Sequence, residues 1–472
     1  MRAKPSVDPQ AVVREFDAIS LGDTRLDSRA RAIVEALAAS PGESFPRQEA
    51  TIAGREALYR FLANPKVSMD KLLAGHVQGT VERVRGRSHV RVLHDSSAFK
   101  FSGDREGLGS LLGNHKGFIG HFTLAVSADE TREPLGVLAV SASVRSTSRE
   151  LSAAERMKLS RARSRAEKKS SRWERQALAA EDLIPTGTRA VHVMDQEADD
   201  FIVYGELRAV GLDFVVRGDP KRLTADGVRV DELLETKPSN VFRSVRLSPR
   251  EKTRSEALSK TRLPRVERDA HLEIRWGVVS LPRRPALDYR LDEVSLNAVH
   301  VTEPSPPPGE QAIEWMLFTS ETVTNLEEAT AVVDHYRARW IIEEYFKALK
   351  TGCAFERRQL TSFEGLTRAL ALFTPIAWHM LTLRHLARVA PSKPASTIFD
   401  SEQLLLLAAM LKRHRYVLPD SPTSRDAMLG IAALGGHIKN NGDPGWQVLG
   451  RGYVRFAQAE EGWRLARTSD QS

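Results

Sequence analysis

The sequence contains a single cysteine, Cys353, in 472 residues. One thiol cannot form an internal disulfide framework or a cysteine-rich zinc site, and it fits a reducing compartment in which it is buried or incidental. The first ten residues lack the apolar core of a signal peptide. The longest uncharged apolar run, 369–383, is short for a membrane span and contains His379. We therefore expect a soluble, cytoplasmic protein without a membrane partner.

The sequence also lacks any visible internal repeat. Because the chain is longer than a typical single domain, two or three domains are expected. The formal net charge is +8, and the excess lies in two tracts. Eleven Lys or Arg face four Glu between Arg145 and Arg175, and nine face three between Arg243 and Arg268. Such blocks indicate a polyanionic partner, and nucleic acid is the first candidate.

Hydrophobic periodicity predicts an α/β chain with a helical unit at each end. Three segments near the N-terminus have a helical pattern: 11–19, 24–37 and 50–62. The following region has the order β-β-β-α-β-α-β, with strands at 90–97, 121–128, 135–144, 190–194 and 213–217 and helices at 152–183 and 200–210. Alternating segments between 220 and about 315 predict a β-rich insertion, and 315–319 resumes the buried pattern. The chain after 386 is predicted to be mainly helical.

The stretch 333–352 predicts one helix that carries a narrow polar stripe. Five side chains fall within an arc of roughly 80°: Tyr336, Arg339, Glu343, Lys347 and Lys350. The opposite side is apolar, with Ala338, Ile341, Ile342, Tyr345, Ala348 and Leu349, and Gly352 is a candidate C-cap. One carboxylate flanked by cations suits a metal ligand beside phosphate-binding groups. An ion-paired, solvated helix face is the alternative interpretation.

Two of the predicted strands end in an aspartate, Asp95 and Asp195. Ligands of open α/β sheets bind outside strand ends, although an aspartate there can also cap a turn. Three carboxylates without cysteines or paired histidines suit Mg²⁺, and two such ions can activate a nucleophile for phosphodiester chemistry. His94 and His192 adjoin the aspartates in sequence, so we expect them on the other faces of their strands.

The set Asp95, Asp195 and Glu343, with the spacing Tyr336-x-x-Arg339-x-x-x-Glu343 followed by Lys350, resembles the DDE transposases of bacterial cut-and-paste insertion sequences. Further matches are DQEAD at 195–199, FVVR at 214–217, LGDTRLDSRA at 21–30, YRFLANP at 59–65, and LGG followed by PGW at 434–446. The resemblance covers nearly the whole chain.

The resemblance implies a ribonuclease H-like core, a mixed five-stranded sheet with a β-strand insertion before the glutamate helix. It divides the chain into a helical DNA-binding domain at 1–72, a catalytic domain at 73–385 with the insertion at about 220–315, and a helical dimerisation domain at 386–472. The expected partners are double-stranded DNA, as transposon end repeats and target, and a second copy of the chain in a synaptic dimer. The expected location is the bacterial nucleoid.

The resemblance also implies a Mg²⁺-dependent enzyme, with Mn²⁺ as a substitute, that cuts transposon ends through a hairpin and joins the 3′ ends to target DNA. By matching position, Asp95, Asp195 and Glu343 are the catalytic, metal-binding residues. The residues expected to bind DNA are Tyr336, Arg339, Lys350, Lys347, Trp340, Trp315, Arg217, Arg25, Arg29 and Arg60. Trp315 and Trp340 match aromatics near a flipped base, or else are core residues.

One departure concerns the loop after Arg217. Asp219 and Pro220 stand where some relatives have a second basic residue, so phosphate contact there depends on Arg217, Lys221 and Arg222. Two other functions remain open. A ribonuclease H-fold nuclease or resolvase would cut without strand transfer, and a catalytically silent relative would bind DNA as an inhibitor.

Overall fold

The computed structural model describes residues 9–45, 51–111, 115–144, 170–247, 266–285, 287–414, 416–438 and 443–469. Most of the two predicted basic tracts, 145–169 and 248–265, lies outside the described residues. No helix in the described part of the chain is long and apolar enough to cross a membrane.

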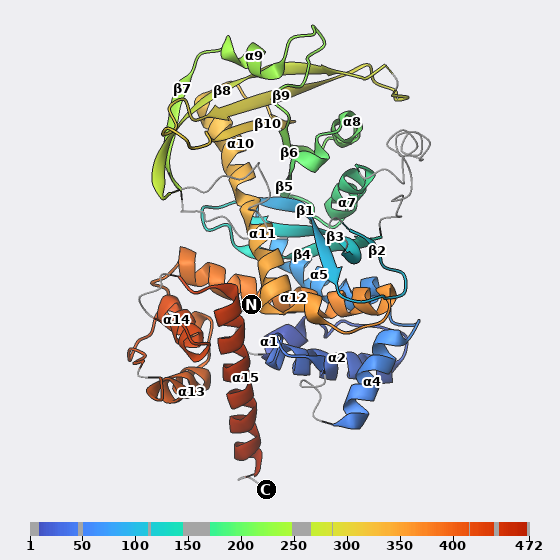
Figure 1. The fold of residues 1–472 in the computed structure, drawn as a ribbon, viewed down its shortest axis with the longest axis vertical. Helices are drawn as coiled ribbons and strands as arrows, with labels where there is room; N and C mark the ends of the chain where they lie inside the picture. The colour runs from blue at the N-terminus through green and yellow to red at the C-terminus, as the bar shows by residue number, and fades with distance from the viewer. Residues whose placement is uncertain are drawn as a thin grey trace.

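The N-terminal region is helical, as predicted (Figure 1). Its helices are α1 (Pro9–Arg14), α2 (Thr24–Ala39), α4 (Ile52–Ala63) and α5 (Met69–Val84). Side chains of Asp23, Thr51 and Ser68 cap α2, α4 and α5, which explains where these helices begin. The helix predicted for 11–19 is shorter than expected, because the backbone after Arg14 continues in tight turns with bonds between residues three apart.

The centre of the molecule is a mixed sheet, which the described residues build from ten strands in the order β2-β3-β1-β5-β6-β10-β9-β8-β7, with β4 paired to β3. The strands are β1 (His89–Phe101), β2 (Gly109–Ser110), β3 (Lys116–Ser127), β4 (Pro134–Ser143), β5 (Arg189–Met194), β6 (Asp213–Gly218), β7 (Asn240–Leu247), β8 (Arg268–Pro282), β9 (Glu293–Thr302) and β10 (Glu314–Thr319). β1, β5 and β6 are parallel neighbours, and the other pairings are antiparallel. The predicted mixed α/β class is confirmed.

The structure corrects the sequence reading in two places. The insertion strands continue the main sheet, because β10 pairs with β6 and β9 pairs with β10 (Figure 1). The buried residues Met316, Leu317 and Phe318 make β10 an inner strand, so β6 has no open edge along these pairs. Strand β1 does not end at Asp95 but runs to Phe101, because β3 pairs with it along its whole length.

The two faces of the sheet carry separate cores. Successive side chains of β5 and β6 point to opposite faces of the sheet. Val193 and Val215 therefore lie in one core, and Met194 and Phe214 lie in the other. Two helices cover the second core, α7 (Ser171–Glu181) and α8 (Phe201–Ala209). Helix α7 precedes β5, and α8 connects β5 to β6. Helix α9 (Val230–Glu235) packs on β8 and β9.

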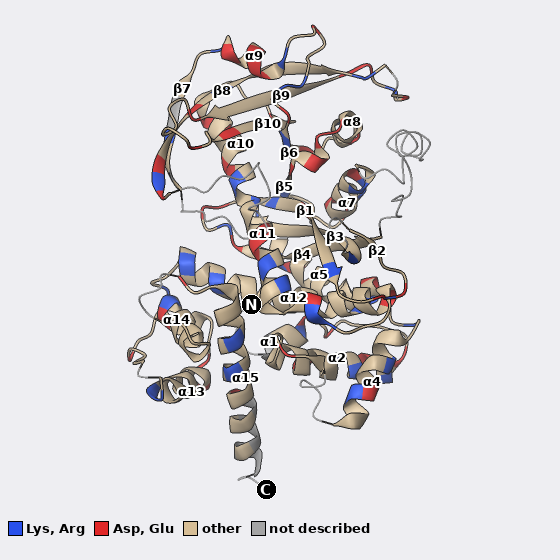
Figure 2. Cartoon of the chain, in the orientation of Figure 1, with Lys and Arg blue, Asp and Glu red and all other residues tan. Residues whose placement is uncertain are grey.

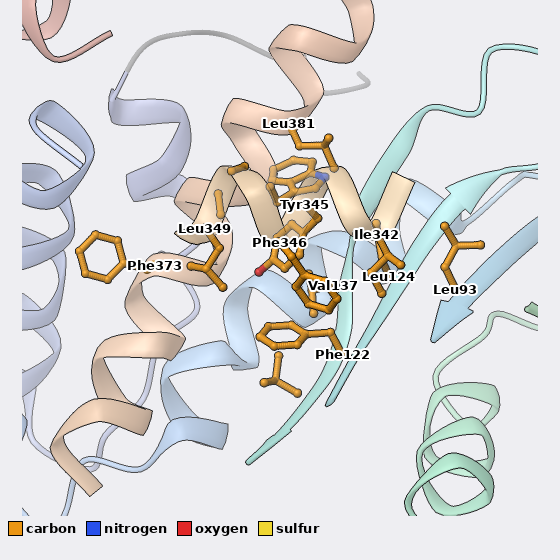
Figure 3. Close-up of a cluster of buried hydrophobic side chains, with 14 of the residues drawn as sticks. Leu93, Phe122, Leu124, Val137, Ile342, Tyr345, Phe346, Leu349, Phe373 and Leu381 are labelled. Atoms are coloured by element: carbon orange, nitrogen blue, oxygen red, sulfur yellow. The ribbon is translucent and has the colours of Figure 1, made fainter. Parts of the chain in front are cut away.

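The first core packs the sheet against a long helical segment formed by α10 (Leu326–Ala338), α11 (Trp340–Lys347) and the π-helix η4 (Ala348–Gly352). In Figure 3, Phe122 of β3 faces Tyr345 and Phe346 of α11, and the ring centroids lie 5.5 and 5.4 Å apart. The apolar side predicted for this helix is buried throughout, including Ile342 and Leu349. Burial of this face fixes the direction in which Glu343 points.

The C-terminal region is helical, as predicted, and lies beside the N-terminal helices (Figure 1). Its elements are η5 (Phe355–Arg357), α12 (Phe363–Val389), η6 (Ala395–Thr397), α13 (Ser401–Lys412), α14 (Ser424–Leu434) and α15 (Trp446–Ser469). A separate core of Phe399, Leu407, Leu411, Tyr453 and Phe456 joins η6 and the last three helices. Helix α15 also packs on η4 and α2, so it lies beside the end of the glutamate helix.

Candidate functional site

Asp95, on β1, and Asp195, directly after β5, lie at the same level of two neighbouring parallel strands. The last parallel pair of β1 and β5 is Leu93 with Val193, and each aspartate follows two residues later. Because side chains alternate along a strand, both aspartates are expected on the face of Leu93 and Val193, which packs toward α10 and α11. The parallel pairing of β1 and β5 ends here, at the carboxyl end of β5, and ligands of such sheets bind outside the carboxyl ends of parallel strands.

Glu343 reaches the same place from the first turns of α11. The predicted helix is divided at Arg339, which ends α10 and begins α11 with a tight turn in which the Ile342 amide donates to the Arg339 carbonyl. The predicted C-cap at Gly352 is wrong, because Ala354 is the residue in the left-handed region, with φ 47°. Gly352 lies inside η4 and packs closely on Met380, since a Cβ there would lie 2.9 Å from Cε of that side chain.

One guanidinium joins the carboxylates. Nη1 of Arg339 donates to Oδ2 of Asp95 at 2.8 Å, and Nη2 donates to Oε1 of Glu343 at 2.5 Å. Asp195 lies within electrostatic range of both Asp95 and Arg339. The three acids that are 100 and 148 positions apart in the chain therefore converge around one arginine.

The site holds more negative than positive charge. Burial raises the pKa of Asp95 to about 7, and the nearby Asp195 and Glu343 add to this effect, although Arg339 and the Ser96 amide oppose it. Burial also raises the pKa of Asp195, although its side chain accepts a bond from the Glu197 amide at 2.8 Å. Asp195 therefore does cap the following turn, as the alternative interpretation proposed, and still belongs to the acidic cluster.

The donor chemistry of this cluster fits a divalent cation. All three side chains offer hard oxygen ligands, and burial raises the pKa of both Asp95 and Asp195, so ionising them without a cation is costly. In the described residues, no group of three or more His, Cys, Asp or Glu side chains is arranged to hold a metal ion as it stands. Arg339 lies between Asp95 and Glu343 instead, so the metal-binding role of the three acids remains a prediction.

The predicted orientation of the neighbouring histidines is confirmed. Nε2 of His94 and Nδ1 of His192 are 2.8 Å apart on the opposite side of the sheet, and His192 contacts Glu181 of α7 at 3.0 Å. Burial lowers the pKa of His94 well below its usual range. This network links β1 and β5 on the face opposite the aspartates. No local sequence pattern indicates which of these side chains pair.

The predicted aromatic DNA contacts divide into two kinds. Trp315 and Tyr336 pack edge to face with their ring centroids 5.8 Å apart; Tyr336 is buried in the core, and the half-buried Trp315 packs against it. Trp340 is 56% exposed, and Nζ of Lys347 lies 5.1 Å from its ring centroid. Of these aromatics, Trp340 has the exposed ring face that stacking on a base requires.

The predicted lysines are both engaged within the protein. Nζ of Lys350 donates to the Ala98 carbonyl of β1 at 2.6 Å, and burial lowers the pKa of this lysine. Lys347 is exposed and pairs with Glu344 at 2.5 Å. Lys350 thus joins the end of the glutamate helix to the strand that carries Asp95.

The loop after Arg217 is held by the DQEAD segment. Arg222 pairs with Asp199, which also accepts bonds from the Tyr204 hydroxyl and the Asp219 amide, each at 2.8 Å. Sequence reasoning missed this role of Asp199, because its partners lie up to 23 positions away. Arg217 is half-buried on β6, and Arg222 is not a free cation.

Three arginines predicted to contact DNA lie exposed on the N-terminal helices, Arg25 and Arg29 on α2 and Arg60 on α4. Within the described part of the chain, none of their side chains forms an ion pair, so their charges are available to a polyanion. Their contact with DNA remains a prediction.

Two family models match the chain. The model described as transposase DNA-binding matches residues 8–67, and the model described as transposase DDE domain matches residues 180–374. The chain belongs to the DDE-type transposases. The second match includes Asp195 and Glu343, and the first covers the helices that carry Arg25, Arg29 and Arg60.

One similar solved structure is a cryo-EM structure of piggyBac transposase in a synaptic complex with hairpin DNA. It is 10% identical, with a TM-score of 0.36, over 82% of this chain and 77% of that chain.

Proposed function

We propose that this transposase binds the terminal inverted repeats of its element, cleaves the ends by metal-dependent phosphodiester hydrolysis, and joins the 3′ ends to target DNA. The observation that supports this most is the convergence of Asp95, Asp195 and Glu343 on one face of the sheet, with a surplus of negative charge. Such a surplus in a buried site indicates a function rather than a contribution to stability.

Asp95, Asp195 and Glu343 are the residues that would hold the cation, and we propose Mg²⁺, with Mn²⁺ as a substitute. Held by these carboxylates, the cation would supply activation of a water or 3′-hydroxyl and stabilisation of the leaving oxygen. The chain itself positions the carboxylates, through the paired strands β1 and β5 and the buried face of α11.

Arg339 is proposed to bind phosphate when DNA enters the site. Its planar fork already binds carboxylate oxygens from two directions, and the same geometry suits phosphate oxygens. Lys350 and Lys347 would add positive charge along the same helical segment, and Trp340 would supply a stacking surface. Tyr336 and Trp315 would support Arg339 from the core, because the ring of Tyr336 lies 5.8 Å from its guanidinium.

The remaining organisation is also proposed. Strands β4-β3-β1-β5-β6 would form the ribonuclease H-like core within a catalytic domain at 73–385, and 220–315 its insertion. Helices at 1–72 would bind the end repeats, with Arg25, Arg29, Arg60 and, from the core, Arg217 as phosphate contacts. The helices at 386–472 would form the synaptic dimer, and the enzyme would act at the bacterial nucleoid as part of an insertion sequence.

The test is incubation of the protein with Mg²⁺ and DNA that carries the candidate inverted repeats flanking its own gene. We expect cut ends, hairpinned ends as an intermediate, and joining to a target plasmid. Cutting without joining on paired ends would support the nuclease or resolvase function instead. Binding without any cutting, with either Mg²⁺ or Mn²⁺, would support the silent DNA-binding relative.

A further inference from the structure

A groove of about 690 Å³ opens at the end of the helical segment that carries Glu343. It lies between the loop after α2, the segment η4–η5 and the first half of α15. Lys350, at the end of the glutamate helix, lines one side, and Arg451 and Arg455 of α15 line another. The groove therefore continues from the predicted phosphate contacts toward the C-terminal helices.

The floor of the groove is closely packed backbone. A Cβ on Gly450 would lie 3.0 Å from the Gly352 carbonyl oxygen, and one on Gly42 would lie 3.4 Å from the same oxygen. The buried Arg358 donates to the carbonyls of Pro41 and Cys353, each at 2.5 Å, and so holds two of the segments together. These contacts hold the loop after α2, the segment η4–η5 and α15 together, and the three glycines place no side chain in the groove, which leaves room for a ligand backbone.

The walls carry more positive than negative charge. Four cations line the groove, Lys350, Arg357, Arg451 and Arg455, against two acids, Glu43 and Glu356. Arg357 and Arg451 are exposed, and neither side chain has a hydrogen bond or ion pair within the described residues. Figure 2 shows basic positions on α15 where it lies beside the end of α11.

We propose that this groove binds the sugar–phosphate backbone of the DNA strand that adjoins the scissile phosphate. The proposal rests on the transposase function and adds a surface to it. Unpaired arginines bind phosphate through their planar forks, and a line of such cations tracks a strand without reading its sequence. Lys350 would be the point at which the strand passes from the cleavage site into the groove.

The position of the strand can be tested by site-specific cross-linking. The chain has one cysteine, Cys353, which is buried with its pKa raised to about 12, so a cysteine placed at the exposed Gln458 would be the reactive thiol. A thiol-attached photo-cross-linker on Gln458→Cys should attach to end DNA within a few nucleotides of the cut. Thr236→Cys, at the exposed end of α9, is the control and should give no such product.

The contribution of charge can be tested through the salt dependence of binding to the same end DNA. The double variant Arg357→Gln/Arg451→Gln should lower the slope of log K against log salt by about 2, since each phosphate contact contributes about 0.9. The control Arg284→Gln/Lys237→Gln removes two exposed cations of the insertion and should leave the slope unchanged.

The outcomes separate the two proposals. Wild-type cutting, with no cross-link from Gln458→Cys and a slope equal to that of the control, would overturn the groove and leave the transposase function standing. A wild-type protein that neither binds nor cuts its end DNA would overturn the function itself. If the double variant fails to fold, the cross-link alone decides the matter.

Discussion

Two buried clusters of charged residues in this molecule have similar composition but differ in the number of partners that each carboxylate has. Near the N-terminus, one carboxylate, Glu15, is matched by two partners, His76 at 2.6 Å and Arg83 at 2.7 Å. In the acidic site, Arg339 pairs with two carboxylates, Asp95 and Glu343, and Asp195 lies within electrostatic range of Arg339 and Arg172. The protein supplies enough partners for the carboxylate of the first cluster, but not for the carboxylates of the second.

The pKa values express this difference. Burial alone would raise the pKa of Glu15, but His76 and Arg83 more than offset it and lower the pKa to about 2. At Asp95, burial and the neighbouring acids outweigh Arg339, and the pKa is raised to about 7. A carboxylate that has enough cationic partners in the protein stabilises the fold. Carboxylates that lack such partners are instead available to bind a cationic ligand.

The largest expected effect concerns chemistry. Asp95→Asn or Glu343→Gln should reduce cleavage of end DNA by at least about 10³-fold, because each removes a carboxylate that would hold the catalytic cation, while binding of the DNA stays close to wild type. Gel-shift and cleavage assays on the same samples measure both. Glu15→Gln should cut normally per folded molecule. Equal loss of binding and cleavage in Asp95→Asn would contradict the role assigned to this residue.

The next effect concerns stability. Glu15→Gln should lower the free energy of unfolding by about 3 kcal/mol, because it removes one partner from a buried cluster and leaves Arg83 without its carboxylate. Urea unfolding provides the measurement. Glu82→Gln, on the exposed side of the same helix as Arg83, is the control and should stay near wild type. A wild-type stability for Glu15→Gln would break the comparison between the clusters.

The two clusters should respond to pH with opposite signs. The folded-state pKa of Glu15 lies below its ordinary value of 4.5, so its stabilisation is present above 4.5 and is lost as pH falls toward 2. The folded-state pKa of Asp95 lies above its ordinary value of 3.8, so the stability that it contributes is present below 3.8 and is lost as pH rises to about 7.

Relative to wild type, Asp95→Asn should therefore gain stability between pH 4 and 7, by on the order of 2 kcal/mol. Glu15→Gln should instead lose stability between pH 2 and 4.5. Urea unfolding measured at several pH values between 2 and 7 gives the free energy of unfolding of each variant and tests both pH dependences. The same sign for the two variants would show that the acidic site is as well matched as the N-terminal cluster.

The smallest effect on stability is expected from the basic tracts at 145–175 and 243–268. Their cations lie largely outside the described residues, so the prediction rests on sequence. Neutralising several of them should change the melting temperature little and should flatten the salt dependence of DNA binding. An unchanged slope would indicate solvated surface.

Much of the site could be predicted because its signals are local. Period-two patterns located the strands, so Asp95 and Asp195 could be placed on or next to two strands of one sheet, although β1 continues past Asp95 to Phe101. The 3.6-residue period placed Glu343 opposite the buried Ile342 and Leu349. The same alternation put His94 and His192 on the opposite face, where the structure places them.

The rest could not be predicted because it depends on pairings between distant segments. Arg339 bonds to a carboxylate 244 positions away, and Glu15 bonds to a histidine 61 positions away. No spacing along the chain indicates such partners. The continuity of the sheet through β10 was missed for the same reason, since a strand pattern does not indicate its neighbours.

The most direct test of the central claim is the effect of a divalent ion on the melting temperature, measured with Mn²⁺ and Mg²⁺ in the presence of end DNA. The melting temperature of the wild type should rise with ion concentration, because an ion bound to the folded state stabilises it. Asp95→Asn, Asp195→Asn and Glu343→Gln should each lose most of this rise, and Glu327→Gln, an exposed acid on α10, should keep it. An equal rise in all five proteins would contradict a shared ion site at the three carboxylates.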